Sequence, residues 1–109
     1  MIYEAFDLKD KVSAIKKSAS VHVYCPDNYE EFSSGVKRKT VVVIPGGGYE
    51  WCSNRENEPL AFELLAHDMN AFTIEYSVRE DIEFPYPMIQ VFALIAYIRA
   101  NAEKYHIDP

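Results

Sequence analysis

The clearest structural signal in this chain is Val41-Val42-Val43-Ile44-Pro45-Gly46-Gly47-Gly48-Tyr49. Four apolar β-branched residues predict a strand that is buried on both faces, because such side chains pack well in a covered, pleated sheet. The glycines that follow have no Cβ atoms, so their N–H groups can converge on one point and a ligand can come close. Open α/β sheets bind ligands at the carboxyl ends of parallel strands. The stretch therefore predicts an anion-binding loop at such a strand end.

Further strands are predicted on both sides of this one. Residues 19–24 alternate small or polar with apolar side chains and stop at Pro26, which predicts a half-buried strand. The buried strand itself is predicted over 40–44, and residues 71–76 predict another. The first residues, 2–15, are ambiguous, and one interpretation is a strand at the edge of the sheet.

Two helices are predicted between and after these strands. Asn57-Glu58-Pro59 is typical of a helix start, with a capping side chain, an early acidic residue and a proline in the first turn. Asn70 is expected to end this helix as a left-handed residue. A second helix is predicted from Met88 to about Tyr105, with Pro87 in its first turn. It is apolar on nearly all sides, so it needs cover from two directions.

This order of strand, strand, helix, strand and helix predicts an α/β fold with a mostly parallel sheet flanked by helices. A chain of 109 residues forms at most one domain. Little of so short a chain is left to cover the second helix. We therefore expect further polypeptide beside that helix, either more sequence or a partner.

Composition limits the classes of partner. The formal net charge of -6 argues against nucleic-acid binding and against docking on an anionic membrane. The one basic cluster, residues 37–39, is expected to be a solvated loop before the strand. Residues 1–17 lack the apolar core of a secretory signal, and the longest apolar segment, 88–98, is too short to span a bilayer. We therefore expect a cytoplasmic protein in which Cys25 and Cys52 are reduced thiols.

Together the motifs resemble the N-terminal part of an α/β-hydrolase esterase, of the acetyl-esterase, xylan-esterase and small-lipase type, from about Val21 to Pro109. The core of the resemblance is the segment 45–49, which corresponds to the HGGG-type motif of esterases and lipases. A proline replaces the histidine there, as in the esterase branch with a PGGGY loop. Further segments resemble the family's next elements in the right order: 56–61, 70–76, 84–87, 96–99 and 106–109.

The chain departs from the family pattern at three points. Ser77 stands where an arginine is common, and Gln90 stands where an aspartate is expected. In the family the segment 107–109 is followed by a strand and the Gly-x-Ser-x-Gly elbow, and these 109 residues contain no such motif. The acid and the base of the triad come later still. The resemblance therefore implies that residues 1–109 are the N-terminal segment of a single three-layer α/β-hydrolase domain, without nucleophile, acid or base.

The resemblance also implies a site. The backbone N–H groups of Gly47 and Gly48 would contribute to an oxyanion hole, Gly46 would supply the turn, and Tyr49 would flank the pocket. The implied activity of the complete protein is that of a serine carboxylesterase or lipase-like hydrolase that acts on small-molecule esters with short acyl or acetyl groups. No cofactor or metal is implied. From the glycines alone, a tight turn without a ligand is the alternative.

Other reactive side chains give weaker signals. Cys52 would need an activating base nearby to act as a nucleophile, and we expect it to be a packed or loop residue instead. Arg55 and Glu56 are expected to pair and brace the glycine loop. The spacing of the histidines predicts no metal site. They are expected on a strand, on the first helix and at a helix end, respectively: His22, His67 and His106.

Two alternatives to the esterase interpretation stay open. The first is a truncated hydrolase homologue without catalysis, which acts by binding a partner. The second is one half of a split enzyme whose triad lies on a complementing chain. In the resembled sheet the 40–44 strand lies beside the strand that is missing, and an open apolar edge favours association, as in a homo-oligomer. In either case these 109 residues alone are expected to be inactive.

Overall fold

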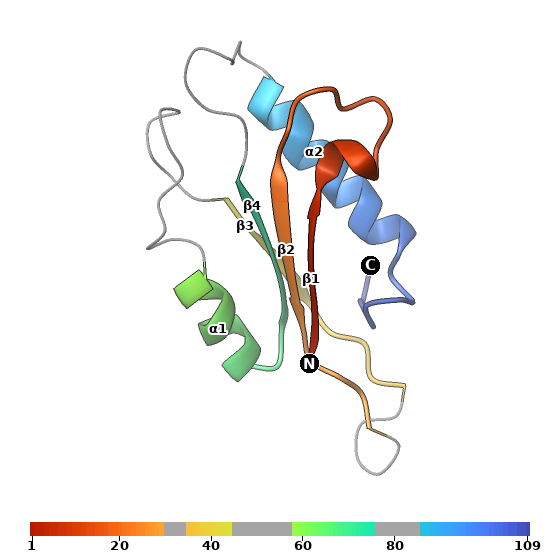
Figure 1. Cartoon of the computed structure of the whole chain (residues 1–109). Coiled ribbons are helices and arrows are strands. Elements are labelled where there is room, and N and C mark those ends of the chain that lie inside the picture. The colour runs from red at the N-terminus through yellow and green to blue at the C-terminus, as the bar shows by residue number, and fades with distance from the viewer. Residues whose placement is uncertain (30–34, 45–57, 76–85) are drawn as a thin grey trace.

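The computed structural model describes residues 1–29, 35–44, 58–75 and 86–109. Figure 1 shows the helices and strands in their arrangement around one sheet. All strands that the sequence predicts are present, and the ambiguous N-terminal segment forms a strand at the sheet edge. In chain order the elements are β1 (Ile2–Asp7), η1 (Leu8–Asp10), β2 (Ser20–Cys25), β3 (Thr40–Val43), α1 (Glu58–Ala66), β4 (Asn70–Glu75) and α2 (Tyr86–Ala100).

The four strands form one sheet in the order β1-β2-β4-β3. β2 pairs antiparallel with both β1 and β4, whereas β3 and β4 pair parallel. The sheet of the described residues is therefore mixed, and the parallel pairing that the sequence predicts holds for β3 and β4. These two strands are joined through α1, and a helical crossover is the connection that brings consecutive strands parallel. The direct connection from β1 to β2 reverses the chain instead.

The two helices lie on opposite faces of the sheet and complete three layers (Figure 1). On the α1 face, Ala61 of α1 packs with Ala71 of β4 and Tyr24 of β2, and all three are buried. Neighbouring residues of a strand point to opposite faces, which separates this set from the larger core. That core, on the α2 face, includes Val21, Val23, Phe72, Ile74, Leu94 and Ile98.

The first turn of α1 is held against β2. The hydroxyl of Tyr24 donates a hydrogen bond to Oε2 of Glu58 at 3.4 Å, and Glu58 is the first residue of α1. Burial raises the pKa of Tyr24 to about 12, so the hydroxyl stays protonated at neutral pH. Glu58, the first described residue after 45–57, is therefore held against the sheet by this bond.

The end of α1 differs from the sequence prediction. α1 ends at Ala66, and the left-handed residue that follows is Asp68, with a φ of 59°, rather than Asn70. Asn70 is fully buried as the first residue of β4, where its N–H donates to the carbonyl of Lys39 at 3.0 Å. Strand pairing thus outweighs the turn preference of asparagine. Asp68 has the short polar side chain that tolerates a left-handed backbone.

The end of α2 also differs. The helix ends at Ala100 rather than near Tyr105, and His106 lies in the turns that follow, with a φ of 56°. Tyr105 is fully buried, and its hydroxyl donates to Oε1 of Glu4 and lies 3.3 Å from the hydroxyl of Tyr97. Burial raises the pKa of Tyr105 well above its usual value, and the hydrogen bond from Tyr105 lowers the pKa of Glu4. The residues after α2 are therefore anchored on β1.

Gln90 is fully buried in α2, at the position where the resemblance leads us to expect an aspartate. Its Nε2 atom donates to the carbonyl oxygens of Lys17 and Ser18 at 3.3 and 3.4 Å. A carboxylate has no proton to donate to these carbonyls, so an amide is the side chain that this contact requires. The departure from the family pattern thus has a structural reason, because Gln90 ties α2 to the connection between β1 and β2.

Replacing Gln90 with a carboxylic acid tests this role. Gln90→Glu is expected to lower the free energy of unfolding at pH 7 by about 2–3 kcal/mol, because a buried carboxylate would face two carbonyl oxygens without a proton. Burial would raise the pKa of the new carboxyl, so its protonated form should recover part of the loss as the pH falls. Urea denaturation followed by circular dichroism measures both effects, with Glu63→Gln on the exposed side of α1 as the control. An unchanged midpoint in Gln90→Glu would contradict the assignment.

Candidate functional site

The residues to which the resemblance assigns an oxyanion hole lie outside the described residues, so their predicted roles stay predictions. The structure describes the framework on either side of them. β3 ends at Val43 and is followed by Ile44, and α1 begins at Glu58. The predicted residues outside the described ranges are Gly46, Gly47, Gly48, Tyr49, Cys52, Arg55, Glu56 and Ser77.

β3 leads toward the glycine segment from the edge of the sheet. Its residues pair in register with β4, from Thr40 opposite Asn70 to Val43 opposite Thr73. Val43 is buried, whereas Ile44, the last described residue before the glycines, is 51% exposed. The chain therefore leaves the sheet at the carboxyl end of a strand that runs parallel to its neighbour, which is the end where open α/β sheets bind ligands.

Two hollows flank β3, one on each face of the sheet. The hollow on the α2 face has a volume of about 400 Å³ and is lined by apolar side chains that include Val42 and Ile95. The hollow on the α1 face has a volume of about 380 Å³, and its lining includes Val41 and Leu64. Ile44 lines both. Within the described residues, β3 thus has an unpaired edge with apolar space on either side.

α2 presents a second apolar surface, directed away from the sheet. Met88, Ile89 and Phe92 are 46%, 46% and 61% exposed, whereas Leu94 and Ile98 are buried. The sequence predicts cover on two sides of this helix. The described residues supply that cover on the sheet side.

The three histidines come from three different parts of the fold. His22 lies half-buried on β2, with its Nδ1 atom 3.0 Å from the hydroxyl of Tyr3. His67 is exposed in the turn after α1, where it lines the α1-face hollow together with Glu63. His106 is not at a helix end as predicted, because α2 stops earlier. Among the residues that the structure describes, no three His, Cys, Asp or Glu side chains are grouped so as to hold a metal ion.

Cys25 is a free thiol at the end of β2, within the core on the α2 face. Burial raises its pKa to about 12. The thiolate that nucleophilic catalysis needs is therefore scarce at neutral pH. We assign Cys25 to the core rather than to a site.

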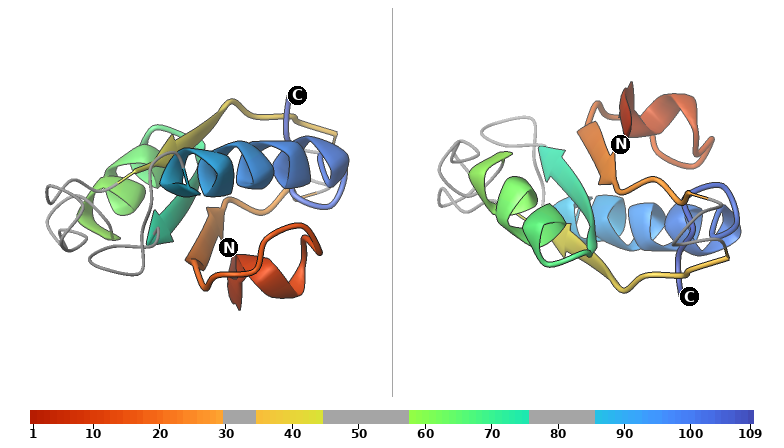
Figure 2. Two further views of the ribbon diagram at one scale, coloured as in Figure 1. Left: turned by 90° about the horizontal axis from the view of Figure 1, so that it is seen from above. Right: turned by 90° about the horizontal axis from the view of Figure 1, so that it is seen from below.

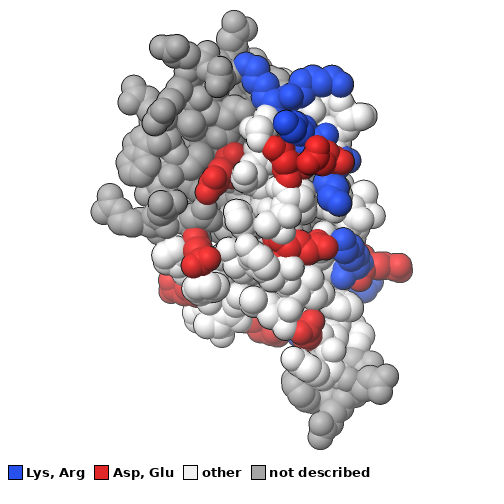
Figure 3. Space-filling model, viewed as in Figure 1, with Lys and Arg blue, Asp and Glu red and all other residues white. Residues whose placement is uncertain are grey.

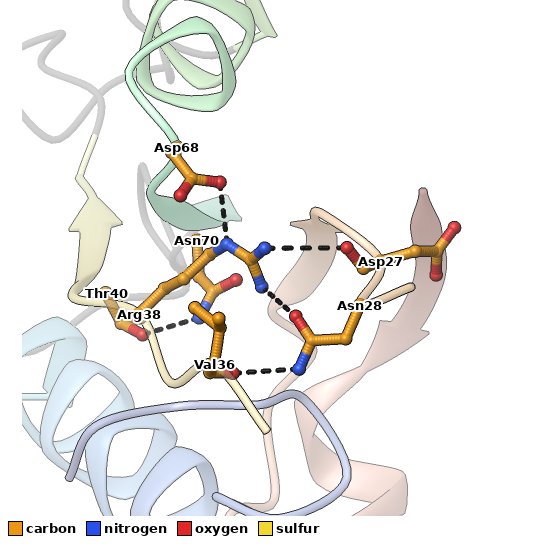
Figure 4. Close-up of polar contacts among 7 residues, drawn as sticks. All are labelled: Asp27, Asn28, Val36, Arg38, Thr40, Asp68 and Asn70. Carbon is orange, nitrogen blue, oxygen red and sulfur yellow. Dashed lines mark hydrogen bonds and ion pairs between the residues drawn. The ribbon is translucent and has the colours of Figure 1, made fainter. Parts of the chain in front are cut away.

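The basic cluster before β3 is not simply a solvated loop, in contrast to the sequence prediction. Lys37 and Lys39 are exposed, but Arg38 between them is buried. Its guanidinium group contacts Asn28 and Asp68 (Figure 4). Three consecutive basic residues usually form a solvated surface, so sequence reasoning missed this one. The available signal was the alternation of side chains along an extended segment that leads into a strand.

The surface around β1 and η1 carries charges of both signs. Figure 3 shows basic and acidic side chains interspersed on this face, with uncharged residues between them.

Of the helices in the described ranges, none combines the length and the apolarity that crossing a membrane requires.

A solved α/β hydrolase matches the whole chain, so the mixed sheet with a helix on each face is part of an α/β-hydrolase fold. The model of the BD-FAE family matches residues 21–109. The chain therefore belongs to the BD-FAE family.

Solved structures show the same fold. An α/β hydrolase, MGS-M1, from a Medee basin deep-sea metagenome library matches 100% of this chain and 43% of its own, with a TM-score of 0.87 and 36% identity. The carboxylesterase Cest-2923 from Lactobacillus plantarum WCFS1 matches 99% of this chain and 38% of its own, with a TM-score of 0.86 and 24% identity. An acetyl ester-xyloside bifunctional hydrolase from Caldicellulosiruptor lactoaceticus matches 97% of this chain and 39% of its own, with a TM-score of 0.79 and 24% identity.

One curated protein is similar in sequence. Endo-1,4-beta-xylanase B from Butyrivibrio fibrisolvens is 40% identical over an alignment of 76 residues that covers 67% of this chain and 12% of that protein. The chain thus spans less than half the length of the solved structures and a small part of the xylanase.

The assignment of Cys25 to the core predicts that its thiol reacts slowly with a disulfide reagent in the folded protein. In a Cys52→Ser variant, which leaves Cys25 as the one thiol, reaction with an aromatic disulfide at pH 8 is expected to be about three orders of magnitude slower in the native protein than in urea. The reason is the small thiolate fraction of a group whose pKa is about 12. Absorbance of the released thiolate measures both rates. Equal rates in a chain that circular dichroism shows to be folded would refute the burial.

Proposed function

We propose that this chain carries the oxyanion hole of a serine carboxylesterase-like hydrolase, with Gly47 and Gly48 as donors, Gly46 as the turn and Tyr49 beside the pocket. The observation that carries the proposal is the placement of β3, which runs parallel to β4 and leads from its carboxyl end into the glycine segment. Membership of the BD-FAE family and the likeness to an α/β hydrolase support hydrolysis as the reaction class.

Ester hydrolysis at such a site passes through a tetrahedral intermediate. The serine oxygen adds to the carbonyl carbon while its proton passes to the base, and the π electrons move to the carbonyl oxygen. When the intermediate collapses, the bond to the alcohol oxygen breaks and the alcohol leaves with that proton. Water then cleaves the acyl-enzyme through a second tetrahedral intermediate and releases the acid. In the proposed site, the N–H groups of Gly47 and Gly48 donate to the negative oxygen. Donors that are fixed beforehand stabilise this charge without reorganisation, and loss of one typically costs about 3–4 kcal/mol of transition-state stabilisation.

The proposed substrates are small esters with short acyl or acetyl groups. One structural neighbour is named as an acetyl ester-xyloside bifunctional hydrolase, and the curated relative is named as a xylanase. These names support acetyl groups on sugars as the substrate class. The cytoplasm is the proposed compartment, and the free thiol of Cys25 fits a reducing environment.

The serine, the acid and the base are proposed to come from polypeptide outside these 109 residues. Two surfaces support this: the unpaired edge of β3 between its two apolar hollows, and the exposed apolar side of α2. Apolar surfaces of this kind are covered in stable proteins. They equally favour a second candidate, one half of a split enzyme, because a complementing chain could cover them too.

A chimera tests the proposed function. It joins residues 1–109 to the part of the MGS-M1 hydrolase that follows the matched region. The 109-residue chain alone is expected to hydrolyse p-nitrophenyl acetate no faster than buffer, because it lacks the nucleophile. The chimera is expected to hydrolyse this ester and to lose activity with a serine reagent. Turnover by the 109-residue chain that a serine reagent abolishes would overturn the proposal.

Within the chimera, Gly48→Pro removes one backbone donor. It is expected to lower kcat by about 10²–10³-fold with little change in KM, because the donor acts on the charge that develops in the transition state. Gly35→Asn is the control, since Gly35 has a φ of +75°, which asparagine tolerates, and nothing lies near its Cβ position. Full activity in a folded Gly48→Pro chimera would count against the oxyanion role.

The unpaired edge of β3 predicts self-association. The 109-residue chain is expected to sediment above its monomer mass of 12.5 kDa at micromolar concentration. Ile44→Lys places a charge between the two hollows and is expected to shift the chain toward the monomer. Val36→Lys, at an exposed apolar residue outside β3, is the control. A monodisperse wild-type monomer that melts cooperatively would speak against an open apolar edge.

A further inference from the structure

Arg38 precedes β3, and its main chain pairs with the segment after α2. The N–H of Arg38 donates to the carbonyl of His106 at 2.9 Å, and the N–H of Asp108 donates to the carbonyl of Arg38 at 2.9 Å. These two bonds form a parallel bridge between Arg38 and Ile107. Both views of Figure 2 show the C-terminal end beside the segment that leads into β3. A parallel ladder thus begins on the edge of β3 that is otherwise unpaired.

The opposite side of the same segment is also paired. Lys39 accepts a hydrogen bond from the N–H of Asn70 at 3.0 Å, and the amide of Asn70 donates to the hydroxyl of Thr40 at 3.3 Å (Figure 4). The main-chain groups of Arg38 therefore bond to the segment after α2, and the carbonyl of Lys39 bonds to β4 on the other side. Consecutive residues of a central parallel strand alternate in this way. The chain enters β3 as a central strand, although the rest of β3 has one open edge among the described residues.

The side chain of Arg38 fixes this segment from a third direction. Its Nε donates to Asp68 at 2.7 Å, one terminal nitrogen donates to Oδ1 of Asn28 at 2.6 Å, and the other donates to the carbonyl of Asp27 at 3.5 Å (Figure 4). Asn28 in turn donates to the carbonyl of Val36 at 2.8 Å. The side chain is only 5% exposed. The planar guanidinium group is suited to several acceptors at fixed angles, whereas lysine offers a single point charge.

A parallel ladder can slip along its neighbour by two residues without losing its alternation of faces, so side chains must specify its register. At this edge the residues on the near side, His106 and Asp108, supply the main-chain bonds. Pro109 is the next residue, and its missing N–H would point away from β3 in the same register. The proline is therefore compatible with a ladder that continues from Arg38 to Thr40.

We infer that Arg38 is a positioning residue that sets the register in which a strand starting at Ile107 runs along β3. A buried ionised side chain is costly, and its best-attested use is to specify one arrangement over others. The consequence for catalysis rests on the proposed function, because register determines where residues beyond Pro109 lie relative to the glycine segment. The register itself does not depend on the reaction.

Amide hydrogen exchange on the 109-residue chain, followed by NMR, tests the inference. Arg38→Met is expected to lower the protection of the Asp108 N–H by about tenfold or more, because the bridge to Ile107 loses its support. The N–H groups of Val23 and Phe72, in the central pair of strands, are expected to keep theirs within about threefold. Lys37→Met removes the same charge from an exposed neighbour and is expected to leave Asp108 unchanged.

A milder series keeps the test decisive if Arg38→Met does not fold. Asp68→Asn retains a side chain that tolerates the left-handed backbone but removes the charge that Arg38 contacts, and Asn28→Ala removes a second acceptor. Each is expected to lower the protection of Asp108 more than that of Phe72. Arg38→Lys is expected to keep more protection of the Asp108 N–H than Arg38→Met but less than the wild-type chain, because one ammonium group cannot contact all three acceptors.

Two results would overturn the inference. The first is unchanged protection of Asp108 in a folded Arg38→Met chain. The second is an equal loss at Asp108, Val23 and Phe72, which would show that Arg38 contributes to global stability alone. An inactive chimera would count against the proposed function and would leave the exchange result untouched.

Discussion

The parallel pairing of β3 with β4 is the interaction on which the rest of the molecule depends. It requires a crossover between consecutive strands, and α1 supplies it while covering one face of the sheet. The glycine segment follows the carboxyl end of β3 in the sequence. On its other side β3 has no strand partner among the described residues, and a hollow lies beside it on each face of the sheet.

The elements could be predicted from the sequence because their signals are local. The β-branched run of β3, the alternation along β2 and the Glu58–Pro59 start of α1 each specify a structure within a few residues. Strand order could not be predicted in this way, since nothing within β2 determines that it runs antiparallel to β4. The end of α1 shows the same limit, because both Asp68 and Asn70 suit a turn. Only the pairing of Asn70 with Lys39, across the sheet, decides between them.

The candidate site and its surroundings likewise contain residues that the sequence singles out and residues that it does not. The glycines were recognisable as candidate donors, a role that stays a prediction, because the chemistry involved is a property of the backbone and of consecutive residues. Arg38 was not, because its burial depends on partners that lie 10 residues away at Asn28 and 30 residues away at Asp68. Gln90 is an intermediate case: its departure from the family pattern was visible, but the reason became clear only with the carbonyls of Lys17 and Ser18 in place.

The contact between Ala61 and Ala71 has a consequence for the position of α1. Two buried methyl groups let α1 lie close to the sheet, and the bond from Tyr24 holds its first residue there. The spacing between α1 and the sheet therefore sets where Glu58, the first described residue after 45–57, lies relative to β2. Larger side chains at these two alanines would push α1 outward, so two methyl groups fix the position of a helix end that lies at a distance from both of them.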